Sequence, residues 1–207
     1  MKDITTSFPS LTELQKREFE ALYDIYVDWN AKINVISRKD IGHLYLHHVL
    51  HSLAIAKYIS FKSDTSVIDV GTGGGFPGIP LAILFPKVRF VLLDSIGKKI
   101  KVAASVAQAI GLTNVETIHS RVEDEKRKFH FVVSRAVMPL PELVKKTKKN
   151  ISDEQINALP NGILCLKGGD LTEEIRPFKR LIDEVPLSDY FSDPFFETKK
   201  LLYLPVR

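Results

Sequence analysis

Apolar residues recur every three or four positions near the start of the chain, with charged residues between them. These apolar positions are Leu11, Leu14, Leu22, Ile25, Trp29 and Ile33. The spacing predicts an amphipathic helix over residues 11–33. Ser10 is followed three residues later by Glu13, which predicts a capping box where that helix begins. A second helix is predicted over residues 41–59, and we expect the two helices to form an N-terminal helical subdomain over residues 1–62.

From residue 66 onward, short apolar runs alternate with helical patterns. The predicted strands cover residues 66–70, 88–93, 115–118, 129–134 and 162–167, with two late candidates at 181–185 and 201–206. Helices are predicted between them over residues 79–85, 98–110 and 140–149. Such alternation implies a mostly parallel, doubly wound sheet. We therefore expect an α/β domain of the Rossmann-like class over residues 63–207, built on a seven-stranded sheet.

Composition narrows the class of protein further. The chain has 207 residues, of which 44% are hydrophobic and 26% charged, as in soluble globular domains. It contains no apolar run of about 18–20 residues, the length that spans a membrane, and its first ten residues lack the apolar core of a signal peptide. The single cysteine, Cys165, lies in an apolar run and is expected to be buried. These features favour a cytoplasmic protein that does not enter a membrane.

The net charge of +4 is small, but basic residues gather in clusters. The clusters are Lys98, Lys99 and Lys101; Arg121 with Lys126, Arg127 and Lys128; and Lys145, Lys146, Lys148 and Lys149. One such run is typical of a solvated helix face. Several in one small domain favour a polyanionic partner such as nucleic acid.

A glycine-rich turn directly after the first predicted strand is the strongest motif. It reads Gly71-Thr72-Gly73-Gly74-Gly75-Phe76-Pro77-Gly78. Glycines let the backbone approach a ligand closely, and open parallel sheets bind ligands at the carboxyl ends of their strands. Gly73, Gly75 and Gly78 also satisfy the dinucleotide pattern G-x-G-x-x-G, so an NAD-dependent oxidoreductase is a competing hypothesis.

Residues around this turn help to distinguish the two cofactors. Asp69 lies two residues before the first glycine, where its carboxylate meets the ammonium group of an amino-acid moiety or fixes the loop. Asp94 ends the next strand, where it accepts hydrogen bonds from the ribose hydroxyls of either cofactor. Pro77 removes an amide donor from the turn. Asp69 and the register of the glycines therefore favour S-adenosylmethionine over NAD.

Further motifs flank the turn in a fixed order. They are Trp29-Asn30, Lys32, Asn34, His48-Val49-Leu50, Leu92-Leu93-Asp94-Ser95, Lys98-Lys99, Ser120-Arg121-Val122-Glu123, Ser134-Arg135-Ala136 and Leu166-Lys167-Gly168. Over residues 29–168 this arrangement resembles the family of ribosomal RNA small subunit methyltransferase G, or glucose-inhibited division protein B. Two features depart from the family pattern: His51 stands where the family usually has Asp, and the chain beyond Gly169 matches only loosely.

The resemblance implies a class I methyltransferase that transfers a methyl group from S-adenosylmethionine to N7 of a guanine in bacterial 16S rRNA, beside the decoding centre. It implies rRNA processing, with 16S rRNA or the small ribosomal subunit as partner. It also implies that Val122 and Glu123 surround the adenine and that Arg135 lies near the reacting groups. With the residue arguments above, the predicted cofactor site comprises Asp69, Gly71, Gly73, Gly75, Phe76, Asp94, Val122, Glu123 and Arg135.

The chemistry of the residues agrees with this reaction. Guanine N7 carries a lone pair and no proton, so its methylation needs positioning rather than a general base, and positioning supplies about 7–11 kcal/mol. Methylation of pyrimidine C5 needs a nucleophilic cysteine, whereas Cys165 lies in a strand. Methylation of amino groups commonly uses an Asn/Asp-Pro-Pro-aromatic turn after the fourth strand. Asp193-Pro194-Phe195-Phe196 resembles that turn but lies near the C-terminus, and we expect a loop there.

Two basic residues are predicted to be catalytic. Arg135 ends the fourth strand, where we expect it to engage guanine O6 or a phosphate, or to shape the cofactor site. Lys167 ends the fifth strand and is predicted to hold an RNA phosphate or the target base, although a plain strand-end lysine is the competing interpretation.

Three histidines share one predicted helical face, at His43, His47 and His51. This spacing suits a metal, but the sequence offers no cysteine or glutamate nearby, so we predict no metal. The chain is expected to be a monomer. Besides the oxidoreductase, a noncatalytic RNA-binding module remains an alternative, because a module of that kind would bind S-adenosylmethionine and transfer nothing.

Overall fold

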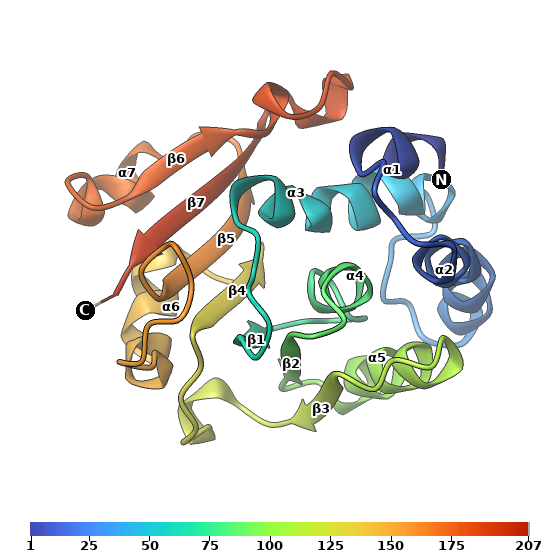
Figure 1. Cartoon of the computed structure of the whole chain (residues 1–207), viewed down its shortest axis with the longest axis horizontal. Helices are drawn as coiled ribbons and strands as arrows, with labels where there is room; N and C mark the ends of the chain where they lie inside the picture. Colours follow the sequence, from blue (N-terminus) through green and yellow to red (C-terminus); the bar gives the residue numbers. More distant parts are fainter. Residues whose placement is uncertain (207) are drawn as a thin grey trace.

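A seven-stranded sheet forms the centre of the computed structural model, which describes residues 1–206 (Figure 1). The strands are β1 Ser66–Val70, β2 Arg89–Asp94, β3 Val115–His119, β4 Phe131–Arg135, β5 Gly162–Gly168, β6 Asp183–Pro186 and β7 Lys199–Pro205. They lie in the order β3-β2-β1-β4-β5-β7-β6, and β1 to β5 are parallel. β7 pairs antiparallel with β5 and β6. The predicted mostly parallel, seven-stranded sheet is confirmed.

Helices cover both faces of this sheet. The α-helices are α1 Lys2–Ser7, α2 Glu13–Lys32, α3 His51–Tyr58, α4 Gly78–Leu84, α5 Gly97–Ala109, α6 Leu140–Thr147 and α7 Thr172–Ile175. A π-helix, η2 Leu44–Leu50, precedes α3. The short 3₁₀-helices are η1 Ile41–His43, η3 Val122–Asp124, η4 Lys148–Asn150, η5 Arg176–Phe178, η6 Leu187–Asp189 and η7 Pro194–Phe196.

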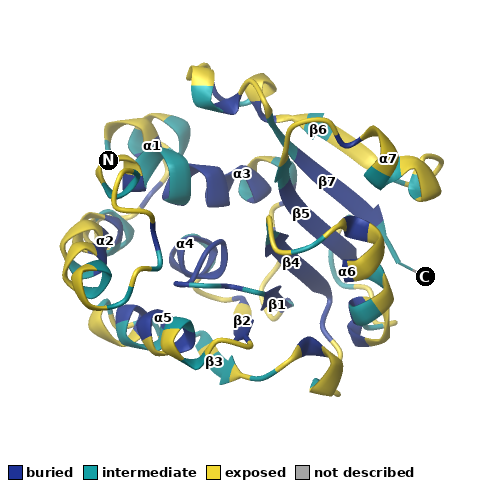
Figure 2. Cartoon of the chain, turned by 180° about the vertical axis from the view of Figure 1, so that it is seen from behind, coloured by how far each residue is buried: buried dark blue, intermediate teal, exposed yellow. Residues whose placement is uncertain are grey.

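The two faces of the sheet have separate apolar cores because successive side chains of a strand point to opposite sides. Val67 packs with α2 to α5, whereas Ile68, its neighbour in β1, packs with α6 and α7. The helix α4 is buried nearly all round between the sheet and α2 and α3, which suits its apolar sequence. In Figure 2 the central strands are buried, whereas the outer faces of α2 and α5 are exposed.

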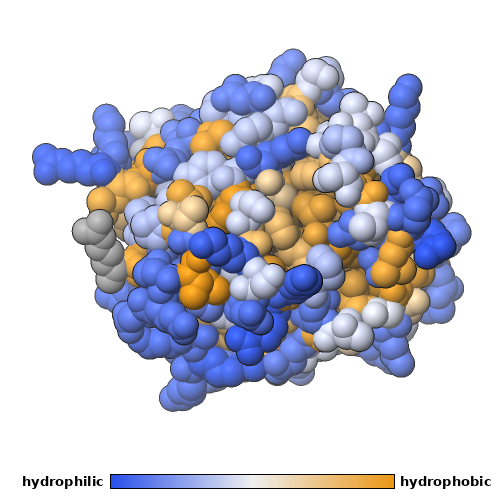
Figure 3. Space-filling model, in the orientation of Figure 1, coloured by the Kyte–Doolittle hydropathy of each residue, from blue (hydrophilic) through white to orange (hydrophobic). Residues whose placement is uncertain are grey.

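The N-terminal helices contribute to the first of these cores. Phe19 and Leu22 of α2 are fully buried in the same cluster as Phe90 and Leu92 of β2. Hydrophilic side chains dominate the rim of the face in Figure 3, and hydrophobic ones show near its middle, in the region of α3 and α4. Within residues 1–206, no helix is long and apolar enough to cross a membrane.

Several local predictions need correction. The capping box of α2 is formed by Thr12 and Gln15 rather than by Ser10 and Glu13: the Thr12 hydroxyl accepts from the Gln15 amide at 3.2 Å, and the Gln15 side chain accepts from the Thr12 amide at 2.9 Å. The helical stretch predicted over residues 41–59 is present without a break from Ile41 to Tyr58, but its geometry changes from 3₁₀ in η1 through π in η2 to α in α3. Residues 194–196, expected as a loop, form the short helix η7 with Asp193 at its N-cap.

Candidate active site

A cleft of about 480 Å³ lies at the carboxyl edge of the parallel strands. Its walls come from the ends of β1, β2 and β4 and from η3, which follows β3. Most of the predicted site residues line it, namely Gly71, Gly73, Phe76, Asp94, Val122, Glu123 and Arg135. The predicted residues outside this lining are Asp69, Gly75 and Lys167. The sheet topology therefore gathers residues that are far apart in sequence.

Asp69 lies beneath the glycine-rich turn and fixes its shape. Its side chain is fully buried, and Oδ2 accepts hydrogen bonds from the Thr72 hydroxyl at 2.6 Å and the Gly78 amide at 2.8 Å. Burial raises the pKa of this carboxyl to about 7. Of the two roles predicted for Asp69, the geometry supports fixing the loop.

Asp94 holds the turn from the neighbouring strand. Its Oδ2 accepts from the Gly73 amide and its Oδ1 from the Ile96 amide, each at 2.8 Å. A carboxylate has about four lone-pair sites, so both oxygens keep acceptor capacity toward the cleft that they border. Asp94 can therefore accept hydrogen bonds from ribose hydroxyls while it orders the turn.

Two glycines show why the turn needs no side chains. Gly71 has φ of +71°, and a Cβ added there would lie 2.5 Å from a methyl carbon of Val137. Gly73 has φ of +59°, and a Cβ added there would meet nothing within 4 Å. The backbone at Gly71 is thus closely packed under Val137, while that at Gly73 faces open space.

Phe76 lines the cleft and packs against the fully buried Tyr26. Phe76 stacks on Tyr26 of α2 with ring centroids 4.9 Å apart, and the Tyr26 hydroxyl donates to the Gly74 carbonyl at 2.8 Å. Tyr26 was missed by the sequence analysis. The available signal was a tyrosine on the apolar side of α2, because a buried tyrosine hydroxyl usually finds a hydrogen-bond partner.

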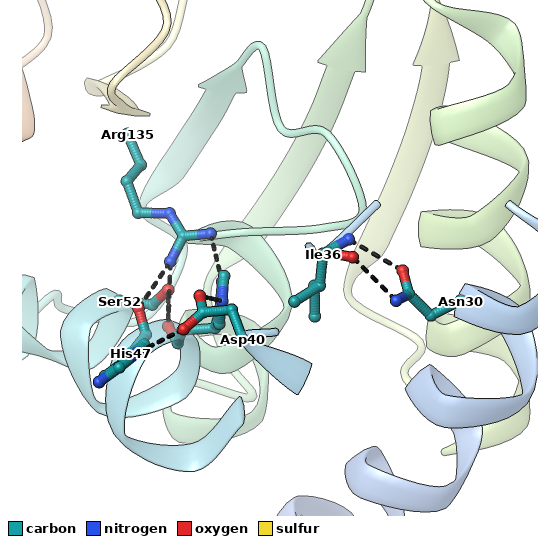
Figure 4. Close-up of polar contacts among 7 residues, drawn as sticks. Asn30, Ile36, Asp40, His47, Ser52 and Arg135 are labelled. Carbon is teal, nitrogen blue, oxygen red and sulfur yellow. Dashed lines mark hydrogen bonds and ion pairs between the residues drawn. The ribbon is translucent and has the colours of Figure 1, made fainter. Parts of the chain in front are cut away.

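A segment between α2 and η1, residues 33–40, also reaches the cleft, and we call it the strap. Val35 of the strap lines the cleft beside Gly74. Asn30 fixes the strap: its Oδ1 accepts from the Val35 and Ile36 amides, each at 2.9 Å, and its Nδ2 donates to the Ile36 carbonyl at 2.8 Å (Figure 4).

Arg135 extends from the end of β4 toward η2 (Figure 4). Its guanidinium lies 4.9 Å from the centroid of the Phe76 ring. Nη1 donates to the His47 carbonyl at 3.3 Å, and Nη2 lies 3.0 Å from Nδ1 of His48. Burial lowers the pKa of Arg135 to about 10, and the nearby Asp69 carboxyl opposes this shift. These contacts fix the charged guanidinium of Arg135 at the wall of the cleft.

Lys167 lies near the end of β5, as predicted, but outside the lining of the cleft. Its Nζ contacts Oε1 of Glu174 at 2.7 Å and donates to the Met138 carbonyl. The same Glu174 oxygen accepts from the Leu140 amide at 2.7 Å. Lys167 thus fastens the loop after β4, which carries Val137 over Gly71, and its contact with substrate stays a prediction.

The predicted basic clusters are partly paired with acids. Arg127 contacts Glu116 and Glu125, and Lys146 contacts Glu123 and Glu142. Besides Arg135, the basic residues that line the cleft are Lys99, Arg121 and Lys146. Because Lys146 is paired with two acids, and Asp94 and Glu123 line the same cleft, the binding of a polyanion by these cations stays a prediction.

The histidines form an aromatic column rather than a cluster of ligands. His43 stacks on His47 at 4.6 Å between centroids, and His47 stacks on Phe195 of η7 at 4.0 Å. His51 is buried with its ring edge-on to Phe195 and Phe196. Among residues 1–206, no three His, Cys, Asp or Glu side chains are placed to hold a metal ion.

Comparison with known proteins gives a consistent result. A sequence profile of the GidB family, described as rRNA small subunit methyltransferase G, matches residues 15–193. The chain is 63% identical over 203 residues to ribosomal RNA small subunit methyltransferase G of Parabacteroides distasonis, covering 98% of this chain and 88% of that protein. Its identity to the protein of the same name from Bacteroides thetaiotaomicron is also 63%, with 98% of both covered.

Solved structures of low sequence identity share the fold. A SAM-dependent methyltransferase from Aquifex aeolicus is similar with a TM-score of 0.57 and 16% identity, over 83% of this chain and 100% of that chain. Fibrillarin from Aeropyrum pernix, solved with S-adenosyl-L-methionine, is similar with a TM-score of 0.55 and 13% identity, over 75% of this chain and 73% of that chain. The predicted Rossmann-like class is confirmed.

Proposed function

The chain belongs to the rRNA small subunit methyltransferase G family, and we propose that it transfers a methyl group from S-adenosylmethionine to N7 of a guanine in bacterial 16S rRNA. The observation that carries this proposal is the cleft itself. At the carboxyl edge of the sheet it joins the glycine-rich turn, the carboxylate of Asp94 and the guanidinium of Arg135. The family membership supplies the substrate class.

The cleft suits S-adenosylmethionine in size and in chemistry. Its volume of about 480 Å³ lies within the range of small-molecule sites, roughly 300–1,000 Å³. Asp94 offers hydrogen-bond acceptors for ribose hydroxyls, and the apolar side chains of Ile96 and Val122 offer surfaces on which an adenine ring can pack. Gly71 and Gly73 expose backbone where the amino-acid part of the cofactor would lie. We therefore assign these residues to cofactor binding.

The residues of the chain perform positioning rather than proton transfer. When bound, S-adenosylmethionine supplies an electrophilic methyl group on a sulfonium centre. Arg135 at the cleft wall would engage O6 of the guanine or a phosphate, leaving N7 free as the nucleophile. Cys165 is excluded as a nucleophile, because its side chain is buried in β5 and burial raises its pKa to about 12. This arrangement matches a nucleophile that carries a lone pair and no proton.

The test is methyl transfer from labelled S-adenosylmethionine to small ribosomal subunits from cells that lack this gene, with the modified nucleotide mapped. We expect label in one guanine as N7-methylguanine. Arg135→Lys should reduce transfer at least 100-fold, as misplaced catalytic groups do. Arg89→Lys changes an exposed arginine at the opposite edge of the sheet and should transfer normally. Binding of the cofactor without any transfer would favour the noncatalytic RNA-binding module, and binding of NAD would favour the oxidoreductase.

Two further expectations rest on the sequence alone. The monomeric state and the cytoplasmic location stay predictions. Light scattering of the purified protein and fractionation of cells are the measurements that decide them.

A further inference from the structure

The guanidinium of Arg135 is held by a helix outside the sheet that carries it. Nη1 donates to the carbonyl of His47, and Nη2 meets the ring of His48. Both histidines belong to η2, a π-helix. π-Helical turns are rare in proteins overall, but those that occur are frequently found at functional sites. The hydroxyl of Ser52 also donates to the His48 carbonyl at 2.6 Å. The position of Arg135 therefore depends on how this turn is fixed.

The contact with Arg135 shows which nitrogen of His48 carries the proton. Arginine only donates hydrogen bonds, so Nδ1 of His48 is the acceptor and must lack a proton. Burial, and next the charge of Arg135, lower the pKa of His48 to about 4, so the ring is neutral at physiological pH. Its proton therefore resides on Nε2, which donates to Oδ2 of Asp40 at 2.6 Å.

Asp40 ends the strap and connects it to both histidines. Its Oδ1 lies 2.5 Å from Nδ1 of His47, while its Oδ2 binds His48. Histidine orientation is commonly set by a carboxylate on the second ring nitrogen. The result is a continuous chain, Asp40 to His48 to Arg135, that runs from the strap to the wall of the cleft (Figure 4).

We propose that Asp40 is a positioning residue for methyl transfer, which fixes the tautomer of His48 and thereby the place of the Arg135 guanidinium beside Phe76. This inference rests on the proposed function. The carboxylate does not line the cleft. It binds the rings of His47 and His48 and reaches Arg135 through His48, and its charge opposes the lowering of the pKa of Arg135. A shift of about 1 Å in a group at a reacting centre costs about 100-fold in rate, so loss of the carboxylate should lower kcat more than it raises KM.

The test compares Asp40→Asn and Asp40→Ala with the matched control Asp28→Asn. Asp28 is an exposed acid of α2 that pairs with Lys32 at 2.7 Å. In ¹⁵N spectra of the free protein, wild-type His48 should show a protonated Nε2 and a bare Nδ1. Asp40→Ala should mix the two tautomers, and Asp40→Asn, which keeps one acceptor oxygen, should retain the wild-type form in part.

In methyl transfer to small subunits, Asp40→Ala should lower kcat by 10- to 100-fold and change the KM for S-adenosylmethionine less than threefold. Asp40→Asn should lie between it and the wild type, and Asp28→Asn should match the wild type. A full kcat in Asp40→Ala, or a reduced kcat with an unchanged His48 tautomer, would overturn the inference. If the wild type transfers no methyl group, the proposed function fails, while the tautomer still tests the link from Asp40 to His48.

Discussion

Gly71 combines two constraints that can be separated by mutation. An alanine there must adopt φ of +71° and place its Cβ 2.5 Å from Val137. Gly111, which follows α5, has φ of +79° and nothing within 4 Å of an added Cβ. Left-handed backbone costs about 1–2 kcal/mol for a residue other than glycine. We expect Gly111→Ala to lower the free energy of unfolding by about this amount in denaturant titrations, and Gly71→Ala to lower it further, because its Cβ also meets Val137.

Only Gly71→Ala should also weaken the binding of the cofactor, since its methyl group displaces Val137 at the cleft. Calorimetric titration should show a Kd for S-adenosylmethionine that is at least tenfold higher, which corresponds to about 1.4 kcal/mol. Equal affinities in the two variants would contradict the assignment of Gly71 to the cofactor site.

His48 gives the stability of the protein a defined pH dependence. Its pKa is lowered to about 4 in the folded protein, against about 6.5 in an unfolded chain. The unfolded chain therefore takes up a proton first as the pH falls. The stability that the neutral ring contributes is complete above pH 6.5 and is lost progressively down to pH 4. At pH 5 the loss from this residue is about 2 kcal/mol.

The groups that face this ring are Asp40, His47 and Arg135. In His48→Asn, the difference in unfolding free energy between pH 7 and pH 5 should shrink by about 2 kcal/mol. His119→Asn alters an exposed ring that contacts the Ser95 carbonyl and serves as control. An unchanged pH dependence in His48→Asn would mean that folding does not lower the pKa of His48.

At the scale of elements, the strap shows how one amide side chain shapes the cleft. Asn30→Ala removes three hydrogen bonds to strap backbone, each worth about 1 kcal/mol. Because Val35 of the strap lines the cleft, the Kd for S-adenosylmethionine should rise about tenfold. The fluorescence of Trp29, the only tryptophan, should report the change.

Asn114 provides a matched control for this experiment. Its amide contacts the carbonyls of Ala82, Phe85 and Val88 near the amino end of β2. Asn114→Ala should cost comparable stability and leave cofactor affinity unchanged. If both variants bind S-adenosylmethionine as the wild type does, the strap does not contribute to the site.

The elements that the sequence predicted well are those with local causes. The strand over residues 66–70 and the turn at Gly71 follow from an apolar run and from glycine chemistry, and both lie where expected. The π-helix η2 was missed, because its stretch has ordinary helical spacing and its distortion accompanies contacts with Arg135, far along the chain. The link of Lys167 to Glu174 joins β5 to α7, and no local pattern indicates it.

At the scale of the whole molecule, the first core joins the N-terminal helices to the sheet. Phe19 of α2 and Phe90 of β2 are buried in one cluster, and the strap and η2 complete the wall around Arg135. The cleft therefore depends on residues before and after position 63. The domain boundary predicted there stays a prediction, and the shared core leads us to expect one cooperative unit.

Two residues that each occur once in the chain allow the joint unfolding of the N-terminal helices and the sheet to be measured. Trp29 is the only tryptophan and lies in α2, and Cys165 is the only cysteine and is buried in β5. In denaturant, fluorescence of Trp29 and labelling of the Cys165 thiol should give coincident transitions, as two-state unfolding requires. Phe19→Ala should lower the free energy of unfolding by about 3–5 kcal/mol and shift both transitions equally. A shift of the tryptophan transition alone would show that the helices unfold separately from the sheet.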